Sequence, residues 1–289
     1  LTPMQALQAI TLTPAEHFRI DGLVGGLAPG RQADMVLLPK LTDFRPSWVF
    51  ARGHMVARDG RMSVPIPPGR LSEDVFPRPR ISHPLAPEDL RIPAPPGREA
   101  VSVRAIRYAA DILTQIELRE VPARNGELSV DPRSDLLKVV VLDRRGHGRI
   151  ARGFVSGYGL RHGALASSIS FDTASLILLG ASDTDMLAAA ERMLRLGGGI
   201  VVASDGSIRA EVPLPLGGVT SNQPMDILAG QIARFQRTLS ELGCLRENPL
   251  LSAQVLTFTA IPAIRIRECG LWDVRRNQVV PLIVDEGNQ

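Results

Sequence analysis

The apolar positions at the start of the chain follow a helical spacing. Met4, Leu7 and Ile10 recur at intervals of three residues, and Thr2-Pro3 supplies an N-cap residue with a proline in the first turn. The pattern predicts a helix here and a second short helical turn that begins at Thr13-Pro14.

The spacing changes after residue 21, where apolar runs become short. Met35-Val36-Leu37-Leu38 and Val49-Phe50 are separated by turn-forming pairs such as Gly25-Gly26 and Asp59-Gly60. We therefore expect a small β module over residues 21–64.

A proline-rich stretch follows, with ten prolines between Val64 and Gly97 and almost no periodic apolar pattern. Proline fixes φ and removes a backbone donor, so this composition predicts an extended linker over residues 65–99.

A second domain is expected from residue 100 to residue 289. Its predicted strands are 136–142, 169–179, 200–203 and 208–212, and its predicted helices are 184–196 and 225–242. Asp183 is the expected N-cap of the first helix, and Gly197-Gly198-Gly199 the expected C-terminal cap rather than a phosphate loop, because it follows a helix and precedes a strand. The predicted fold class is α+β.

Composition narrows the functional classes. The net charge is only +3 and 4% of residues are aromatic, so nucleic acid is not an expected partner. No apolar run reaches 18 residues, so no membrane segment is expected.

Cys244 and Cys269 are single and well separated, which predicts buried thiols in a reduced, cytoplasmic protein. Because the first residue is Leu, we expect the numbering to begin inside a longer reading frame or after processing.

Two early segments resemble the closing strands of the amidohydrolase superfamily. They are Gly25 to Val36, with Gly-Gly-Leu-Ala-Pro-Gly-Arg-Gln-Ala-Asp-Met-Val, and Gly53 to Gly60, with Gly-His-Met-Val-Ala-Arg-Asp-Gly. The resemblance implies that residues 1–20 are the terminal helix of a barrel and that residues 21–64 belong to a barrel-flanking β-sandwich.

Later segments resemble the C-terminal domain of adenine deaminases, in the family's order. They are Asp135 to Val141, Gly153 to Leu160, Gly163 to Ser168, Gly180 to Asp183, Gly197 to Gly199, Pro213 to Gly218 and Gly270 to Val274. This resemblance implies a parent enzyme that converts adenine and water to hypoxanthine and ammonia, with adenine or a related purine as its ligand and homo-oligomeric assembly. A divalent metal (Mn, Fe or Zn) is implied for the barrel of that parent, which these residues lack, so the chain alone is expected to be inactive.

The histidines of this chain do not form a metal-ligand pattern. His17, His54, His83, His147 and His162 show no HxH or HxxxH spacing and no His/Cys pair. We predict structural or surface roles for them and no metal in this chain.

Asp172 is the candidate catalytic residue. It lies in an apolar segment, where a carboxylate must be paired or must face a cleft, so a structural role and a substrate-facing role both stay open. Ser167, Ser168 and Ser221 are candidate substrate-binding residues, although packing is the alternative for the first two. The pair Arg144-Arg145 is expected at a solvated strand end, with contact to an acidic partner chain as the alternative.

The segment around Asp172 departs from the family pattern. Phe171-Asp172-Thr173-Ala174-Ser175 stands where adenine deaminases have His-Asp-Ser-His-Asn, Arg145 stands at an expected histidine, and Thr220 at an expected methionine. Two alternatives follow: a non-catalytic interaction or regulatory module, or a relative that acts on another purine or cyclic amidine.

Overall fold

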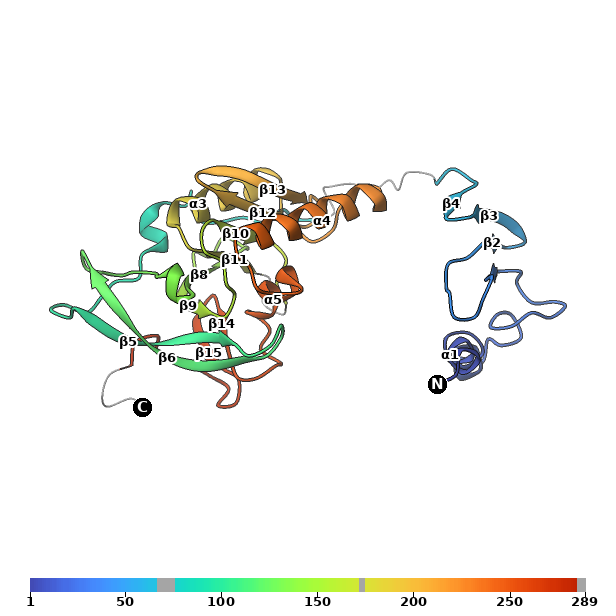
Figure 1. Ribbon diagram of the computed structural model, residues 1–289, viewed down its shortest axis with the longest axis horizontal. Helices are drawn as coiled ribbons and strands as arrows, with labels where there is room; N and C mark the ends of the chain where they lie inside the picture. Colours follow the sequence, from blue (N-terminus) through green and yellow to red (C-terminus); the bar gives the residue numbers. More distant parts are fainter. Residues whose placement is uncertain (67–75, 172–174, 285–289) are drawn as a thin grey trace. The chain divides into compact units, whose positions relative to one another are not determined.

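The computed structural model describes residues 1–66, 76–171 and 175–284, and the chain divides into two compact units, residues 1–70 and 71–289 (Figure 1). The described residues form several helices and largely antiparallel sheets, an arrangement that is compatible with the predicted α+β class. No helix within the described ranges is long and apolar enough to cross a membrane.

The first unit begins with the predicted helices, α1 (Pro3–Ile10) and α2 (Leu12–His17). Thr2 caps α1 as expected: its hydroxyl accepts from the Gln5 N–H at 3.3 Å, and the Gln5 side chain accepts from the Thr2 N–H at 2.8 Å. A four-stranded sheet follows in the order β1 (Met35–Leu37), β2 (Trp48–Ala51), β3 (His54–Arg58) and β4 (Arg61–Met62).

The second unit is built on a nine-stranded sheet in the order β13-β12-β10-β11-β8-β9-β5-β6-β7. Its strands are β5 (Ala100–Tyr108), β6 (Thr114–Arg124), β7 (Glu127–Leu128), β8 (Leu136–Asp143), β9 (Ile150–Ser156), β10 (Ala164–Ser167), β11 (Ser175–Gly180), β12 (Gly199–Ser204) and β13 (Ser207–Pro213). Only β5 and β9 pair in parallel among these neighbours.

Helices and a small sheet complete this unit. They are α3 (Asp183–Arg195), α4 (Met225–Glu241), α5 (Pro249–Val255), the 3-10 turns η2 (Pro87–Leu90) and η3 (Pro132–Ser134), and a sheet of β14 (Ile264–Arg267), β15 (Gly270–Asp273) and β16 (Gln278–Val280).

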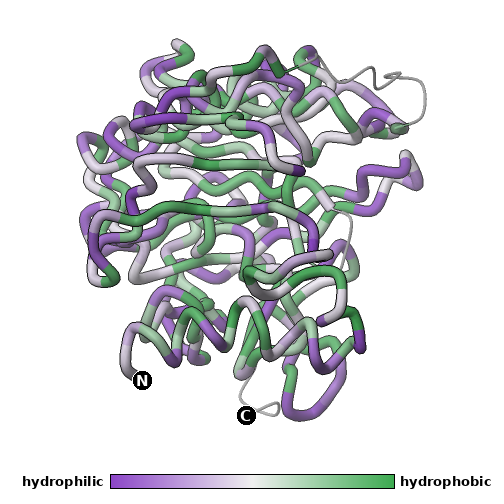
Figure 2. Tube along the Cα trace, turned by 90° about the vertical axis from the view of Figure 1, so that its right-hand side faces the viewer, coloured by the Kyte–Doolittle hydropathy of each residue, from purple (hydrophilic) through white to green (hydrophobic). Residues whose placement is uncertain are grey.

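Both faces of the large sheet are covered, which explains the unbroken apolar run in β8. Val139 and Val141 belong to the core shared with α4 and α5, whereas Val140 and Leu142 belong to the core shared with α3. Figure 2 shows the corresponding long hydrophobic stretches along the strands. Lys138 also points to the α3 side, where its ammonium lies 2.7 Å from the Asp183 carboxylate.

The four strands and two helices that were predicted in this domain lie close to their expected boundaries, with two corrections. The N-cap of α3 is Ser182, whose hydroxyl accepts from the Asp185 N–H at 3.4 Å, and Asp183 is the first helical residue. The strand predicted at 169–179 begins only at Ser175, because residues 169–171 are not in a strand and residues 172–174 lie outside the described residues.

The glycines after α3 end the helix as predicted. Gly197 has a positive φ of 76°, its N–H donates to the Leu194 carbonyl at 3.0 Å, and the Gly198 N–H donates to the Met193 carbonyl at 3.0 Å. This is the hydrogen-bond pattern of a helix C-terminus that closes in the left-handed conformation.

The second half of the proline-rich segment lies against the large sheet. Leu90 is fully buried in the core beneath α3, and Ile92, at 3% exposure, belongs to the core beside β5. The N–H of Arg80 donates to the Arg144 carbonyl at 2.8 Å, which extends the contact to the end of β8. These residues therefore contribute to the core in spite of their proline content.

Candidate functional site

Several of the family-like segments meet at Ser168, directly after β10. Its side chain is fully buried. The Ser168 hydroxyl accepts from the Gly199 N–H at 2.7 Å and donates to the Gly218 carbonyl at 2.5 Å. One hydroxyl thus ties together the end of β10, the start of β12 and the turn after β13, which lie far apart in the sequence.

The neighbouring candidate, Ser167, is also fully buried and is bonded locally. Its hydroxyl lies 3.1 Å from both the N–H and the carbonyl oxygen of Ile169. The structure therefore places both serines where their hydroxyls bond to the backbone, as the packing alternative requires.

The other two candidates are placed differently. Ser221 is half-exposed, and its hydroxyl accepts from the Gln223 N–H at 3.1 Å. It follows the turn from Leu216 to Thr220 and has no recorded bond to Ser168 within the described residues. Asp172 lies outside the described residues.

Arg144 corrects the expectation of a solvated pair. It is half-buried, and its guanidinium donates to the carbonyl of Ser168 at 3.1 Å and to the carbonyl of Gly217. Burial, followed by the positive charge of Arg145, lowers the pKa of Arg144. Arg145 is exposed, as expected.

Gly218 makes this arrangement possible. Its φ is +72°, and a Cβ added there would lie 2.8 Å from an Arg144 nitrogen, 2.8 Å from Pro79 and 3.2 Å from the Ser168 hydroxyl. A larger residue at position 218 would have a strained backbone and would clash with its neighbours. Gly218 therefore allows the turn to pack against the Arg144 side chain.

A cavity of about 550 Å³ opens beside Arg144, and we call it the arginine pocket. It is lined by Phe76, Pro77, Arg78, Arg80, Arg144, Arg145, Gly217 and Val219. Four of these eight residues are arginines and none is acidic. Sequence analysis missed the contribution of residues 76–80, because the proline content pointed to a linker.

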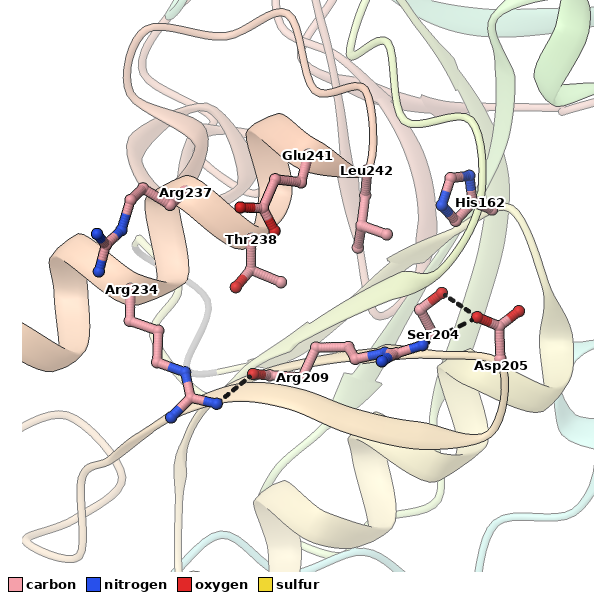
Figure 3. Close-up of a pocket in the computed structure, with 9 residues that line it drawn as sticks. All are labelled: His162, Ser204, Asp205, Arg209, Arg234, Arg237, Thr238, Glu241 and Leu242. Carbon is pink, nitrogen blue, oxygen red and sulfur yellow. Dashed lines mark hydrogen bonds and ion pairs between the residues drawn. The ribbon is translucent and has the colours of Figure 1, made fainter.

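A second cavity, of about 470 Å³, lies between the β12–β13 hairpin and α4, and we call it the mixed-charge groove (Figure 3). It is lined by His162, Ser204, Asp205, Arg209, Arg234, Arg237, Thr238, Glu241 and Leu242. Here two carboxylates lie among three arginines: the guanidinium of Arg209 lies 3.1 Å from Asp205, and the carboxylate of Glu241 also faces the groove.

Two histidines pair with carboxylates outside these two cavities. His83 lies 3.0 Å from Asp89, and His147 lies 3.0 Å from Asp143. Burial would raise the pKa of Asp89, but hydrogen bonds from the Ala86 N–H and from His83 lower it overall.

The two cysteines are free and differ in environment. Cys244 is half-buried, and burial raises the pKa of its thiol. Cys269 is exposed, so the prediction of two buried thiols is wrong for this residue, which lies in the tight turn between β14 and β15.

Residues 1–61 match the amidohydrolase family. Residues 111–278 match the adenine deaminase C-terminal domain, and the chain belongs to that family. The resemblance inferred from the sequence is confirmed.

Individual relatives agree with this assignment. The chain is 33% identical over 290 residues to an adenine deaminase of Desulforamulus reducens and 34% identical over 285 residues to that of Moorella thermoacetica, covering 99% and 98% of this chain. An adenine deaminase of Desulfatibacillum aliphaticivorans is 36% identical over 285 residues, or 97% of this chain. In each case the match covers 48% of the relative, so the chain spans about half the length of the curated relatives it matches.

The family implies a divalent metal, and the donor set here does not fit one. In the part of the chain that the structure describes, no group of three or more His, Cys, Asp or Glu side chains could hold a metal ion. The pairs His83–Asp89 and His147–Asp143 each lack a third ligand.

Proposed function

We propose that this chain forms the C-terminal part of an adenine deaminase, in which adenine and water give hypoxanthine and ammonia. The observation that carries the proposal is the match of residues 111–278 to the C-terminal domain of these enzymes, together with relatives of that name along nearly the whole chain. The chemistry needs an activated water and an acid for the leaving ammonia. The described residues supply no metal site for such a water, so the reaction is assigned to the longer protein.

The proposed domain arrangement of the longer protein rests on the features of the first unit. Residues 1–20 are proposed to be the terminal barrel helix and residues 21–64 the barrel-flanking sandwich. Residues 65–99 are proposed as a connector whose second half packs against the C-terminal domain of residues 100–289. Supporting this, residues 1–61 match the amidohydrolase family, and only Ala15 is buried among the described residues of the first unit. Large apolar side chains stay exposed there, among them Met4, Phe18 and Leu27. Apolar surface of this extent is typical of an interface.

The test is to determine the gene sequence before the Leu1 codon and to express the frame it defines. We expect metal ligands such as a His-x-His segment, and release of ammonia from adenine by the metal-loaded product. The present chain alone is the control and should be inactive. Deamination by the chain alone, or an inactive extended protein with full metal loading, would contradict the proposal.

One observation favours the alternative of a non-catalytic interaction or regulatory module. Phe171 and Ala174 stand where the family has histidines, and the Phe171 ring packs 5.4 Å from the Phe258 ring. An upstream frame without ligand residues would support this alternative.

In an extended protein with metal ligands, the pair Phe171→His and Ala174→His should raise the deamination rate by roughly 10²- to 10⁴-fold if these positions handle a proton. Phe258→His is a matched control, because it introduces an imidazole into the same aromatic contact. An equal gain from the control, or no gain from the pair, would show that the segment is structural. Adenine and other cyclic amidines assayed side by side would identify the substrate.

A further inference from the structure

Strand β6 is an open edge of the nine-stranded sheet over most of its length. Its inner side pairs with all nine residues of β5, and the two strands form a long ribbon (Figure 1). On its outer side, β7 pairs only with Ala123 and Arg124. In the described part of the chain, no strand lies beside the outer side of residues 115–121.

The backbone groups on this outer side have no partner in the middle of β6. The carbonyls of Thr114 and Pro122 point outward, and loop N–H groups donate to them at 3.1 Å each. Every second residue of an antiparallel strand points its backbone groups to the same side, so those of Ile116, Leu118 and Glu120 also point outward. Their N–H and carbonyl groups are bonded to none of the residues that the structure describes. They form a row of donors and acceptors that fits another strand.

The opposite edge of the sheet, β13, is protected in ways that β6 is not. The pairing of β13 with β12 contains a register shift, and Arg234 of α4 donates to the Arg209 carbonyl at 3.2 Å. The free stretch of β6 has no proline, no lysine and no register shift. Its apolar side chains Ile116 and Leu118 are 41% and 55% exposed. Edges without such protection pair readily with a strand of another chain.

The charges on β6 favour one register for pairing with a second copy of the chain. Glu117 and Arg119 flank Leu118 on the same face, 3.7 Å apart, and their side chains are 21% and 29% exposed. When two copies pair antiparallel with Leu118 opposite Leu118, each Glu117 lies opposite Arg119 of the other copy. The two nearest registers that keep the outward groups facing each other place Glu117 opposite Glu117 or Arg119 opposite Arg119. Like charges directly opposite are destabilising, so the first register is preferred.

We propose that β6 pairs antiparallel with β6 of a second copy, about a two-fold axis at Leu118. In this register Leu118 faces Leu118 and Ile116 faces Glu120, and each of these pairs exchanges two backbone hydrogen bonds. One sheet then continues through both copies. The contact is small compared with a standard interface, so we expect a Kd of roughly 10–100 µM. The proposal does not depend on the assignment as part of a deaminase.

Sedimentation velocity of the full chain, from about 1 to 500 µM, tests the pairing with charge-reversal variants. Glu117→Arg places two arginines opposite each other, and Arg119→Glu places two glutamates opposite each other. Each variant alone should raise the dimer Kd at least about tenfold. An equimolar mixture of the two should restore dimers, because both cross-strand pairs then join opposite charges. The double variant Glu117→Arg with Arg119→Glu should dimerise like the parent for the same reason.

The control variants Glu191→Arg and Arg195→Glu reverse the charges of an exposed ion pair on α3, in which the two side chains lie 3.2 Å apart. They should leave the dimer Kd within about twofold of the parent. Thermal unfolding verifies that each variant folds. Glu117 also accepts from the Ser156 hydroxyl at 2.6 Å, so Leu118→Lys, at an exposed position, blocks the edge without removing that bond.

Three results would overturn the proposal. The first is a parent that stays monomeric over the whole concentration range. The second is association that persists in Arg119→Glu and in Leu118→Lys, which would assign it to another surface, such as the exposed apolar side chains of the first unit. The third is a mixture of the two charge-reversal variants that dimerises no better than either variant alone.

Discussion

The two units of this protein differ most in what they bury. In the first unit Ala15 is the single buried side chain among residues 1–66, and large apolar groups such as Phe18 and Phe44 are mostly exposed. In the second unit three apolar cores lie on and beside the nine-stranded sheet. Burial of apolar surface is the main favourable term in folding, so the second unit can supply its own stability and the first cannot do so to a comparable extent.

This difference agrees with the comparisons. The first unit matches the amidohydrolase family over residues 1–61, and the relatives are about twice as long as this chain. The hydrogen bonds of the first unit, such as the cap of α1 by Thr2, define local structure without defining a core. The structure of the first unit is thus defined mainly by local hydrogen bonds, and that of the second unit mainly by the burial of apolar side chains.

The largest expected contrast comes from removing one aromatic ring in each unit. Phe235→Ala empties a fully buried site on α4 and should lower the free energy of unfolding by roughly 3–5 kcal/mol. Phe44→Ala, at an exposed position, should change it by less than about 0.5 kcal/mol.

The chain has one tryptophan in each unit, so the change in the free energy of unfolding can be measured by fluorescence. Urea unfolding followed by the fluorescence of Trp272, in a Trp48→Phe background, reports the second unit, and the fluorescence of Trp48, in a Trp272→Phe background, reports the first. An equal loss from Phe44→Ala would show that the first unit stabilises the second and would remove the contrast.

A buried arginine gives the next largest effect. Arg265 is fully buried, and its guanidinium donates to the hydroxyl of Thr114 at 2.9 Å and to the carbonyls of Ile112, Phe258, Ile261 and Pro262. Burial lowers the pKa of Arg265 to about 10, so it stays charged near neutral pH. Arg265→Met would leave these acceptors unpaired and should cost roughly 2–4 kcal/mol.

The matched change in the first unit is Arg45→Met. The Arg45 side chain is 90% exposed and pairs with Asp43 at 2.9 Å, an arrangement from which little stability is expected. Both variants are measured by the same urea experiment. A stability unchanged by Arg265→Met would mean that water satisfies the freed carbonyls.

The sequence predicted the elements whose signals are local. The apolar run of β8 and the cap and glycine signals around α1 and α3 were enough to predict these elements. The strand β10 was not predicted, because Ala164 to Ser167 is a run of small residues that carries no clear period. In contrast β5 was missed although Val101, Val103 and Ala105 alternate with polar residues, a signal that was available.

The site depended on contacts that no local pattern encodes. Arg144 is half-buried only because the Gly217-Gly218 turn, more than 70 residues later, presents a carbonyl to it. Likewise, Phe76 and Arg80 reach the pocket from a segment whose prolines indicate a linker. Ser168 was a candidate from the sequence, but its bonds to Gly199 and Gly218 are tertiary and could not be inferred from spacing.

The smallest expected effect compares two carboxylates, Asp143 in the second unit and Asp43 in the first. Burial would raise the pKa of Asp143, but N–H donors from His147 and Arg145 lower it overall, whereas Arg45 lowers the pKa of exposed Asp43. At pH 7, Asp143→Asn should lower the free energy of unfolding by about 1 kcal/mol. Asp43→Asn should have no measurable effect.

The pH dependence follows from the direction of the shift. Because the folded-state pKa of Asp143 lies below its unfolded value near 4, the unfolded chain binds the proton more tightly, and the stabilisation exists only while the carboxylate is charged. It is present in full above about pH 5 and is lost as the pH falls through about 4 towards the folded-state pKa. Urea midpoints of the parent and of Asp143→Asn should therefore converge at acid pH, after correction for the common decline of both proteins. A difference that persists unchanged at pH 3 would assign the effect to packing of the β8–β9 turn instead of to the charge.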